Sequence, residues 1–338
     1  MSKPVSLKKR KAAFIAIAAV IIAAVIFALL FFEHLEKKAD KVPEGAGTSA
    51  SRVSEDTTLT YNGKNYVYND HLSTLMILGI DDPELTASDY VRNQSQSDFI
   101  LLAVFDSEKK TCQLIQLNRD SMTDIPVMDD RGQLIGTNFE QLALAHTYGN
   151  GLDQSCKNTE KAVSNLMYGI PIDHYFAVTM DAIPVLNDLA GGVTVKVEDD
   201  FTGVDDTLIK GETVTLTADN VEHFVRTRLT MKDDKSNIAR MHRQQVYMQG
   251  LFEKMNEAYK KNDNFVLDTY DAIAPSLVSD CTIDQMSDYA ECFSTYTHSE
   301  IVSPEGEAKK GETYMEFYVD DAALQQLVVD TFYLPAEG

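Results

Sequence analysis

An uninterrupted apolar run near the N-terminus constrains this chain more than any other feature. Residues Ala12–Phe32 form a stretch of 21 residues without a charge or a strongly hydrogen-bonding side chain. As an α-helix the run measures about 31 Å, close to the roughly 30 Å hydrocarbon core of a bilayer. The basic cluster Lys8–Lys11 precedes it directly, and such clusters stay on the cytoplasmic side. The sequence therefore predicts a transmembrane helix at 12–32 that follows a cytoplasmic basic tail at 1–11.

A cleaved signal peptide is the alternative explanation of this run. The apolar core of a signal peptide usually spans about 7–15 residues and ends at a small-residue cleavage site. The run here is longer, and the segment that follows it, Glu33–Lys38, is charged. We therefore expect a retained single-pass anchor in the plasma membrane, with the C-terminal part of the chain outside the cell.

The charge distribution agrees with a chain whose N-terminal tail and C-terminal body lie on different sides of a membrane. The chain carries 30 Lys+Arg against 52 Asp+Glu, a formal net charge of −22. Residues 1–41 hold eight basic and three acidic residues, and removing their +5 leaves −27 for residues 42–338. An acidic body argues against a general nucleic-acid-binding protein, because such proteins need excess Lys and Arg to neutralise phosphates. The hydrophobic content of 44% excludes full disorder.

Composition also divides the rest of the chain. Residues 33–58 are polar with a run of small residues, which predicts a flexible linker. The main folded domain is expected at 59–260, beginning with a hairpin around Asn62-Gly63. A C-terminal α/β extension, mainly helical over Asn262–Thr297, is expected at 261–338.

Four cysteines suit an exported domain, although their spacing matches no zinc site. Cys281 with Cys292 and Cys112 with Cys156 are the pairings considered. Four reduced thiols fit the sequence equally well.

Strand-like and helix-like segments alternate from Leu72 onward. Short apolar runs predict strands at Leu75–Ile80, Phe99–Phe105, Gln113–Asn118, His174–Thr179, Val193–Val197 and Glu312–Val319. Helices are predicted at Asn138–Tyr148, Glu160–Tyr168, Ala218–Thr227, Ile238–Tyr259 and Asp321–Tyr333. This alternation predicts an α/β domain with a central mixed sheet that helices cover on both faces.

Charged residues flank three of the predicted strands. Asp81 follows the first strand, Arg119 and Asp120 follow the third, and Asp98 opens the strand between them. If Phe99–Phe105 runs antiparallel to its neighbours, its start lies beside their ends and the four side chains converge. Two carboxylates at such a position suit Mg²⁺, which also takes phosphate oxygens. A role in helix caps or turns is the alternative for each acid.

A second cluster is rich in arginine. Arg226 lies at the end of one predicted helix and Arg228 follows it, and Arg240, Arg243 and Gln244 stand at i, i+3 and i+4 on the next. Arginine binds phosphate through two parallel hydrogen bonds and stays charged in any setting. The cluster therefore indicates an anionic ligand, with salt bridges to surface acids as the alternative.

The stretch from Leu75 to Gln245 resembles the catalytic domain of the LytR–CpsA–Psr proteins, which are membrane-anchored enzymes of bacterial cell envelopes. The matching segments occur in the order of the family: Leu78-Gly79-Ile80-Asp81, Gln96-Ser97-Asp98, Asn118-Arg119-Asp120, Ala145-His146-Thr147-Tyr148-Gly149, Gly169-Ile170-Pro171-Ile172-Asp173-His174-Tyr175, Gly191-Gly192-Val193-Thr194-Val195, Phe224-Val225-Arg226-Thr227-Arg228 and Ala239-Arg240-Met241-His242-Arg243-Gln244-Gln245. Each segment alone is weak, but eight in order form a specific signal.

The resemblance implies a phosphotransferase that moves an anionic glycopolymer from a polyprenyl-pyrophosphate carrier to peptidoglycan as a phosphodiester. It implies that Asp81 and Asp98 hold Mg²⁺. The residues that it places around the pyrophosphate are Arg119, Arg226, Arg228, Arg240, Arg243 and Gln244. The catalytic candidates are Asp81, Arg119 and Asp120, with Asp81 as the base that activates the acceptor hydroxyl. Phosphoryl transfer depends mostly on positioning and charge neutralisation, which agrees with these residue types.

The chain departs from the family at several positions. Pro83 and Gln96 stand where many members carry arginine, Gln141 falls near a family lysine, and Val127–Thr137 is predicted as an inserted loop. A non-catalytic lipid-binding or regulatory envelope protein is the alternative that Pro83 and Gln96 suggest, and a polyprenyl-pyrophosphate pyrophosphatase that uses the same acids with water as nucleophile is another. His146 and His174 are predicted to be structural.

Overall fold

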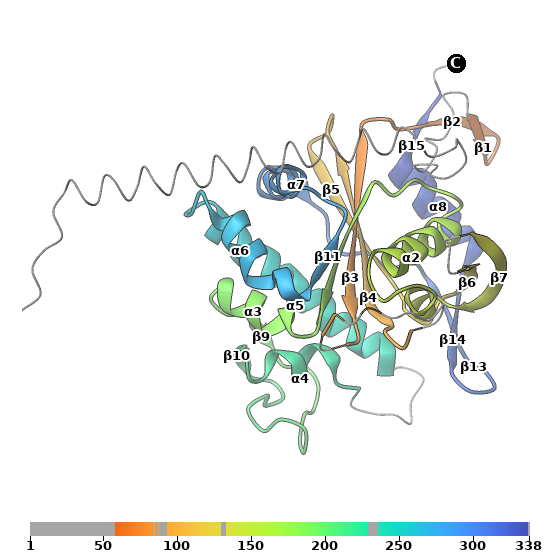
Figure 1. Cartoon of the computed structure of the whole chain (residues 1–338). Coiled ribbons are helices and arrows are strands. Elements are labelled where there is room, and N and C mark those ends of the chain that lie inside the picture. The colour runs from red at the N-terminus through yellow and green to blue at the C-terminus, as the bar shows by residue number, and fades with distance from the viewer. Residues whose placement is uncertain are drawn as a thin grey trace, which may run out of the picture. The chain divides into compact units, whose positions relative to one another are not determined.

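The centre of the structure is a six-stranded mixed sheet. The computed structural model describes residues 58–82, 84–85, 87, 93–129, 133–228 and 236–336. The strands of the sheet are β3 (Leu72–Ile80), β4 (Ser97–Asp106), β5 (Thr111–Leu117), β8 (His174–Thr179), β11 (Leu277–Ser279) and β12 (Thr297–His298). They lie in the order β11-β8-β3-β4-β5-β12, and Figure 1 labels β11, β3, β4 and β5. β4 is antiparallel to both β3 and β5, whereas β3 pairs with β8 and β5 with β12 in parallel. The predicted central mixed sheet is confirmed.

Four helices cover the two faces of this sheet: α2 (Asp153–Leu166), α8 (Asp321–Phe332), α5 (Ser236–Tyr259) and α7 (Ile283–Thr295). Alternate residues of β3 and β4 enter different cores, because successive side chains of a strand point to opposite faces. One core is closed by α2 and α8, and the other by α5 and α7 (Figure 1). This double coverage explains the nearly continuous apolar sequence of both strands and confirms the prediction of helices on both faces.

A smaller lobe packs against α5. Its elements are α3 (Ala182–Leu189), β9 (Thr194–Lys196), β10 (Thr213–Thr215) and α4 (Val221–Arg226). Phe201 and Phe224 stack at its centre with ring centroids 6.1 Å apart, and Tyr247 of α5 joins the same apolar cluster. This packing holds α4, which ends in Arg226, beside α5.

Hairpins surround these layers. Their strands are β1 (Thr58–Tyr61), β2 (Lys64–Tyr68), β6 (Met122–Met128), β7 (Leu134–Gln141), β13 (Gly306–Lys310), β14 (Met315–Val319) and β15 (Tyr333–Pro335). The predicted hairpin around Asn62-Gly63 is confirmed, with both turn residues at positive φ, 49° and 74°.

The predicted helix at Asn138–Tyr148 is wrong for Asn138–Gln141, and most of the predicted inserted loop at Val127–Thr137 belongs to strands β6 and β7. β7 runs to Gln141 and pairs with β6 from Met122 onward, and only Leu142–Thr147 turns as a 3₁₀ helix, η1. The hydrogen-bond partners of β7 lie in a neighbouring strand, so pairing overrode the local helical pattern.

The C-terminal segment also holds a strand that the sequence did not indicate. After α6 (Phe265–Ile273), Pro275 lies in a short 3₁₀ turn, η2 (Ala274–Ser276), and β11 then pairs with β8. β11 has three residues, too few to show a period of their own. Residues 277–279 thereby belong to the central sheet.

The two cysteine pairings considered from the sequence are wrong. All four cysteines lie in the described part of the chain and are free thiols. Cys112 and Cys156 belong to cores on opposite faces of the sheet. Cys281 precedes α7 and Cys292 lies near its end, a separation of about 15 Å at 1.5 Å per residue, whereas a disulfide needs Cα atoms within about 7 Å.

The predicted transmembrane helix at 12–32 lies outside the described residues and stays a prediction. Within the described residues, no helix combines the length and the apolar character needed to cross a bilayer. The 24-residue α5 is long enough, but it carries charged and amide side chains along its length.

Glu160 makes the stability of this fold depend on pH. Burial on α2, with Asp280 and Asp173 nearby, raises the pKa of Glu160 to about 7. A carboxyl whose folded pKa exceeds its unfolded value stabilises the protein below the unfolded pKa, and this contribution is lost as pH rises through the folded pKa. We expect Glu160→Gln to gain about 1–2 kcal/mol of unfolding free energy relative to the parent between pH 5 and pH 8.

Urea unfolding at the two pH values measures this gain. Glu291→Gln, on the exposed side of α7, controls for the removal of one negative charge. A constant difference in stability between Glu160→Gln and the parent across this range would contradict the assignment.

Candidate functional site

The antiparallel course of β4 brings distant acids and arginines together. Asp81 follows the end of β3, Asp98 lies at the start of β4, and Arg119 follows β5, so all three lie at one edge of the sheet. Asp98 accepts hydrogen bonds from Arg119 and from Nη1 of Arg240, the latter at 2.9 Å. The convergence predicted from the strand order is therefore present.

Arg119 is held on three sides. One Nη donates to Asp98, the other Nη donates to Oε1 of Gln96, and Nε lies 3.4 Å from Asp120. Its side chain is only 10% exposed. Gln96 thus supplies an acceptor that orients the guanidinium of Arg119.

Asp120 supports Arg119 from inside the protein. It is buried, accepts a hydrogen bond from Gln141 at 3.0 Å, and its backbone carbonyl accepts one from Phe317. Burial raises the pKa of Asp120, although Arg119, Arg228 and Arg240 act in the opposite direction. Asp120 is not among the described residues that line the pocket at this edge, so it acts as a positioning residue.

α4 contributes the opposite wall. Arg226 donates to Asp81 at 3.0 Å and to Glu222, one turn earlier on the same helix, at 3.1 Å. The Arg226 and Asp81 side chains are 44% and 42% exposed, so solvent and ligands reach this pair.

These residues enclose a polar pocket of about 430 Å³. Its described lining residues are Asp81, Asp98, Arg119, Glu222, His223, Arg226, Thr227, Arg228 and Arg240. Four arginines face three carboxylates, so the lining has a net charge of +1 with neutral histidine. A positive pocket in a chain of net charge −22 suits a bound anion.

The sequence did not single out Glu222, His223 and Thr227. His223 and Arg226 are three residues apart on α4 and therefore share one side of the helix. The sequence shows this three-residue spacing, but it does not show which side of α4 faces the arginines.

Arg243 lies elsewhere. Its guanidinium donates to the backbone carbonyls of Phe224 and Thr227 and to the carboxylate of Asp199, and it stacks over the ring of Phe201. It is not among the described lining residues of the pocket. Arg243 instead holds the end of α4 and thereby the backbone that carries Arg226 and Arg228.

The side chain of Gln244 also forms its hydrogen bonds within the protein. It accepts a hydrogen bond from Gln116 of β5 at 3.1 Å and donates to the carbonyl of Val225 at 3.4 Å. These contacts join α5 to the sheet and to α4. Gln244 lines a neighbouring apolar cavity and is not among the described residues that line the polar pocket.

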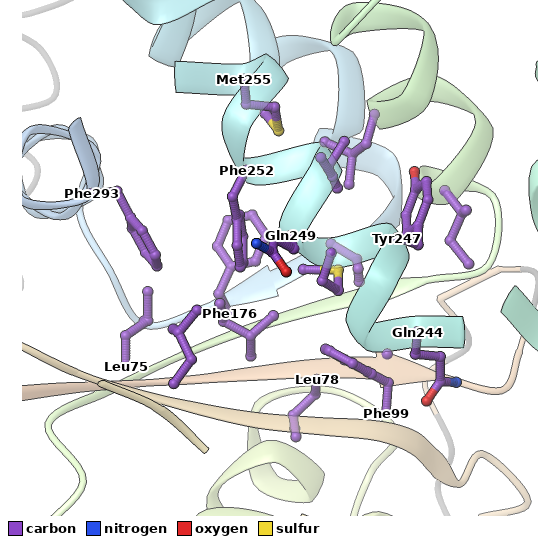
Figure 2. A pocket seen from close by; sticks show the side chains of 18 of the residues that line it. Leu75, Leu78, Phe99, Phe176, Gln244, Tyr247, Gln249, Phe252, Met255 and Phe293 are labelled. Atoms are coloured by element: carbon purple, nitrogen blue, oxygen red, sulfur yellow. The ribbon is translucent and has the colours of Figure 1, made fainter. Parts of the chain in front are cut away.

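A large apolar cavity continues from the polar pocket. It has a volume of about 590 Å³ and lies between the sheet and helices α5, α6 and α7. Figure 2 shows Leu75, Phe99 and Phe176 on the sheet side, with Phe252 and Phe293 on the helices. The cavity and the polar pocket share Asp98, Arg226 and Arg240. The combined shape suits a ligand with an anionic head and a long apolar tail.

His146 has a structural role. It is buried, its Nδ1 lies 2.9 Å from the carbonyl of Ser95, and burial lowers its pKa to about 4. The imidazole is therefore neutral at physiological pH and lies outside the described lining of the polar pocket.

His174 belongs to the group of three potential metal ligands found within the described residues, together with Asp280 and Cys281. Nε2 of His174 accepts from the amide of Gln285 at 2.9 Å, and Thr282 fixes the orientation of that amide. The ring proton is thus on Nδ1, which lies 3.4 Å from Asp280, and the amide of Gln285 occupies Nε2. His174 is structural.

The position of Arg243 leads to a prediction. Arg243→Lys keeps a charge near Asp199 but loses donors to the two carbonyls that end α4. We expect a loss of about 1–3 kcal/mol in unfolding free energy. Displacement of Arg226 and Arg228 should weaken pyrophosphate binding on the order of tenfold, which is about 1.4 kcal/mol.

Calorimetric titration with inorganic pyrophosphate, together with thermal unfolding, measures both effects. Lys254→Ala, on the exposed side of α5, is the matched control. Reduced stability with unchanged pyrophosphate affinity would show that Arg243 serves folding alone.

Comparisons with known proteins agree with this geometry. The chain is 26% identical over 258 residues to the polyisoprenyl-teichoic acid–peptidoglycan teichoic acid transferase TagU of Bacillus anthracis, covering 75% of this chain and 76% of the relative. It is 26% identical over 226 residues to TagU of Enterococcus faecalis, covering 65% and 66%.

Solved structures share the fold. Bacillus subtilis TagV superposes with a TM-score of 0.60 at 20% identity, covering 77% of this chain and 95% of TagV. The LytR-CPS2A-psr family protein YwtF (TagT) with bound octaprenyl pyrophosphate lipid superposes with a TM-score of 0.54 at 21% identity, covering 78% and 90%.

The model of the LytR_cpsA_psr family matches residues 33–330. This match extends beyond the segment Leu75–Gln245 that carries the sequence resemblance, and it includes nearly all of α8. The chain belongs to the LytR_cpsA_psr family.

Proposed function

We propose that this protein transfers an anionic glycopolymer from a polyprenyl-pyrophosphate carrier to peptidoglycan, forming a phosphodiester and releasing polyprenyl phosphate. The observation that carries this proposal is the union of an arginine-lined pocket with a long apolar cavity. The names of the relatives, teichoic acid transferases, support the same reaction class.

The apolar cavity accounts for the lipid part of the substrate. Its walls are aromatic and aliphatic side chains, and each methylene that the cavity removes from water contributes about 0.8 kcal/mol. The arginines that it shares with the polar pocket support a pyrophosphate position at the cavity mouth.

The polar pocket accounts for the pyrophosphate. Arg119 and Arg240 are anchored through Asp98, and Arg226 through Asp81, before any ligand binds. Such preorganised cations stabilise the charge that spreads over the phosphate oxygens in the transition state, without reorganisation during the reaction.

Asp81 and Asp98 would hold Mg²⁺ in this proposal. Both carboxylates line the same pocket, and Mg²⁺ usually binds one or two carboxylates together with substrate phosphates. When bound, the ion neutralises charge on the pyrophosphate. Because Asp81 is engaged by Arg226 and assigned to the cation, we give it a binding role rather than that of the base.

The proposed location follows from the sequence. The span at 12–32 anchors the protein in the plasma membrane, and the domains at 59–260 and 261–338 lie outside it. An apolar cavity for a membrane lipid is consistent with that location.

The full-length protein in lipid vesicles tests the proposed function. Polyprenyl-pyrophosphate-linked glycopolymer, Mg²⁺ and peptidoglycan are supplied, and polyprenyl phosphate and glycan-modified peptidoglycan are measured. Release of polyprenyl phosphate only with acceptor supports the transferase. Release without acceptor identifies a pyrophosphatase, and lipid binding without release identifies a binding protein.

The cavity leads to a separate prediction. Ala290 lines the cavity from α7, and Ala290→Trp fills part of the space in which the lipid tail lies. We expect binding of a fluorescent polyprenyl phosphate to weaken at least tenfold, or about 1.4 kcal/mol. Glu291→Trp adds the same ring at the next, exposed position and serves as the control. Equal lipid affinity in both variants would rule out this cavity as the lipid site.

A further inference from the structure

A histidine–aspartate pair lies at the edge of the polar pocket and has no part in the binding scheme above. We propose that His223, oriented by Asp205, is the general base that takes the proton from the attacking hydroxyl. This inference rests on the proposed function, because it names the group that activates the acceptor in that reaction.

The pair has the geometry of an oriented base. Nδ1 of His223 lies 2.7 Å from Oδ2 of Asp205. The other oxygen of Asp205 accepts hydrogen bonds from the backbone N–H of Thr207 at 2.9 Å and from its hydroxyl at 2.6 Å. The Asp205 side chain is only 10% exposed, so the carboxylate has a fixed position. A catalytic base held by a third group in this way is typical of activated nucleophile sites.

Asp205 is ionised in this arrangement. Burial would raise the pKa of Asp205, but the hydrogen bonds from Thr207 and His223 outweigh it, and the pKa lies below its ordinary value. An ionised carboxylate at Nδ1 keeps the ring proton there, and Nε2 of the neutral ring is then the proton acceptor.

His223 is placed where an acceptor can reach it. Its ring lines the polar pocket, and it stands one turn before Arg226 on α4. Its side chain is 50% exposed, so a large acceptor approaching from solvent can contact it. His223 lines the polar pocket and is not among the described residues that line the lipid cavity.

The carboxylates of the pocket are less suited to this task. Asp81 and Glu222 are bound by Arg226, and Asp98 is bound by Arg119 and Arg240. Other charged groups face His223: Asp205 from its loop, Glu222, Arg226 and Arg228 from α4 and its end, and Asp81, Asp98, Arg119 and Arg240 from across the pocket. Within the described lining, His223 is the one proton-accepting side chain that forms no ion pair with an arginine.

The proposed step conserves atoms and charge. The acceptor hydroxyl gives its proton to Nε2 of His223, and its oxygen forms a bond to the phosphorus next to the glycopolymer. The bond from that phosphorus to the bridging pyrophosphate oxygen breaks, and the electron pair leaves with polyprenyl phosphate. The exposed imidazolium then returns the proton to solvent.

Three variants of the full-length protein in vesicles test the role. We expect His223→Ala to lower kcat for transfer by at least 100-fold, the lower range for loss of a general base, with carrier-lipid affinity unchanged within twofold. Added imidazole should restore part of the rate, and the acid-side decline of kcat/KM should disappear. Asp205→Asn should lower kcat about tenfold or more, because the ring loses its orientation.

His71→Ala is the matched control. His71 is another exposed histidine beside acids, 3.7 Å from Asp70 and 3.9 Å from Glu108, and it lies at the start of β3, away from the pocket. Its replacement should leave the rate and the pH profile as in the parent.

The outcomes separate the two claims. If the parent transfers glycopolymer and His223→Ala keeps its rate and pH profile, the role of His223 is overturned. Loss of lipid binding in His223→Ala without rescue by imidazole shows a structural role and overturns it as well. A parent protein without acceptor-dependent transfer rejects the proposed function itself, and this inference with it.

Discussion

The arrangement of the site depends on one carboxylate, Asp98, and the two guanidinium groups that bind it. Asp98 is 14% exposed, and its partners Arg119 and Arg240 are 10% and 4% exposed. Burying an unpaired charge is costly, so these groups stabilise the fold only together. Because Asp98 belongs to β4, Arg119 follows β5 and Arg240 belongs to α5, the triad fixes the start of α5 over the edge of the sheet. Asp98 and Arg240 line both the polar pocket and the apolar cavity.

This arrangement explains how a strongly acidic chain offers a site for an anion. The net charge of −22 is spread over the chain, whereas four arginines meet three carboxylates in one pocket. The carboxylates hold most of these arginines in place, so the ligand does not have to order long flexible side chains on binding. Specificity for an amphiphile then follows from shape, because the anionic head and the apolar tail occupy two connected spaces of opposite character.

A second group of contacts positions α4. Arg243 binds the carbonyls at the end of this helix, and Phe224 of the helix stacks on Phe201. α4 carries Glu222, His223 and Arg226 to one side of the pocket, so its placement determines both phosphate binding and the proposed proton acceptor. The apolar packing of the lobe that contains α4 thus fixes the position of the residues that this lobe contributes to the pocket.

The sequence by itself indicated the α/β class and its buried strands, because hydrophobic periodicity is a local property. It also predicted the apolar span at 12–32. The approach of Asp81, Asp98 and Arg119 followed from it on the condition that the strand after Asp98 is antiparallel to its neighbours. Tertiary structure decided the rest. Arg240 and Arg243 are separated by only about 60° around a helix, since each residue advances it by roughly 100°, yet one faces the sheet and the other faces α4. β7 is a strand because it pairs with β6. The contact between Asp205 and His223 depends on a turn that the sequence did not indicate. Which side of a helix meets a pocket depends on what packs against it, and that information lies in contacts between residues distant in sequence.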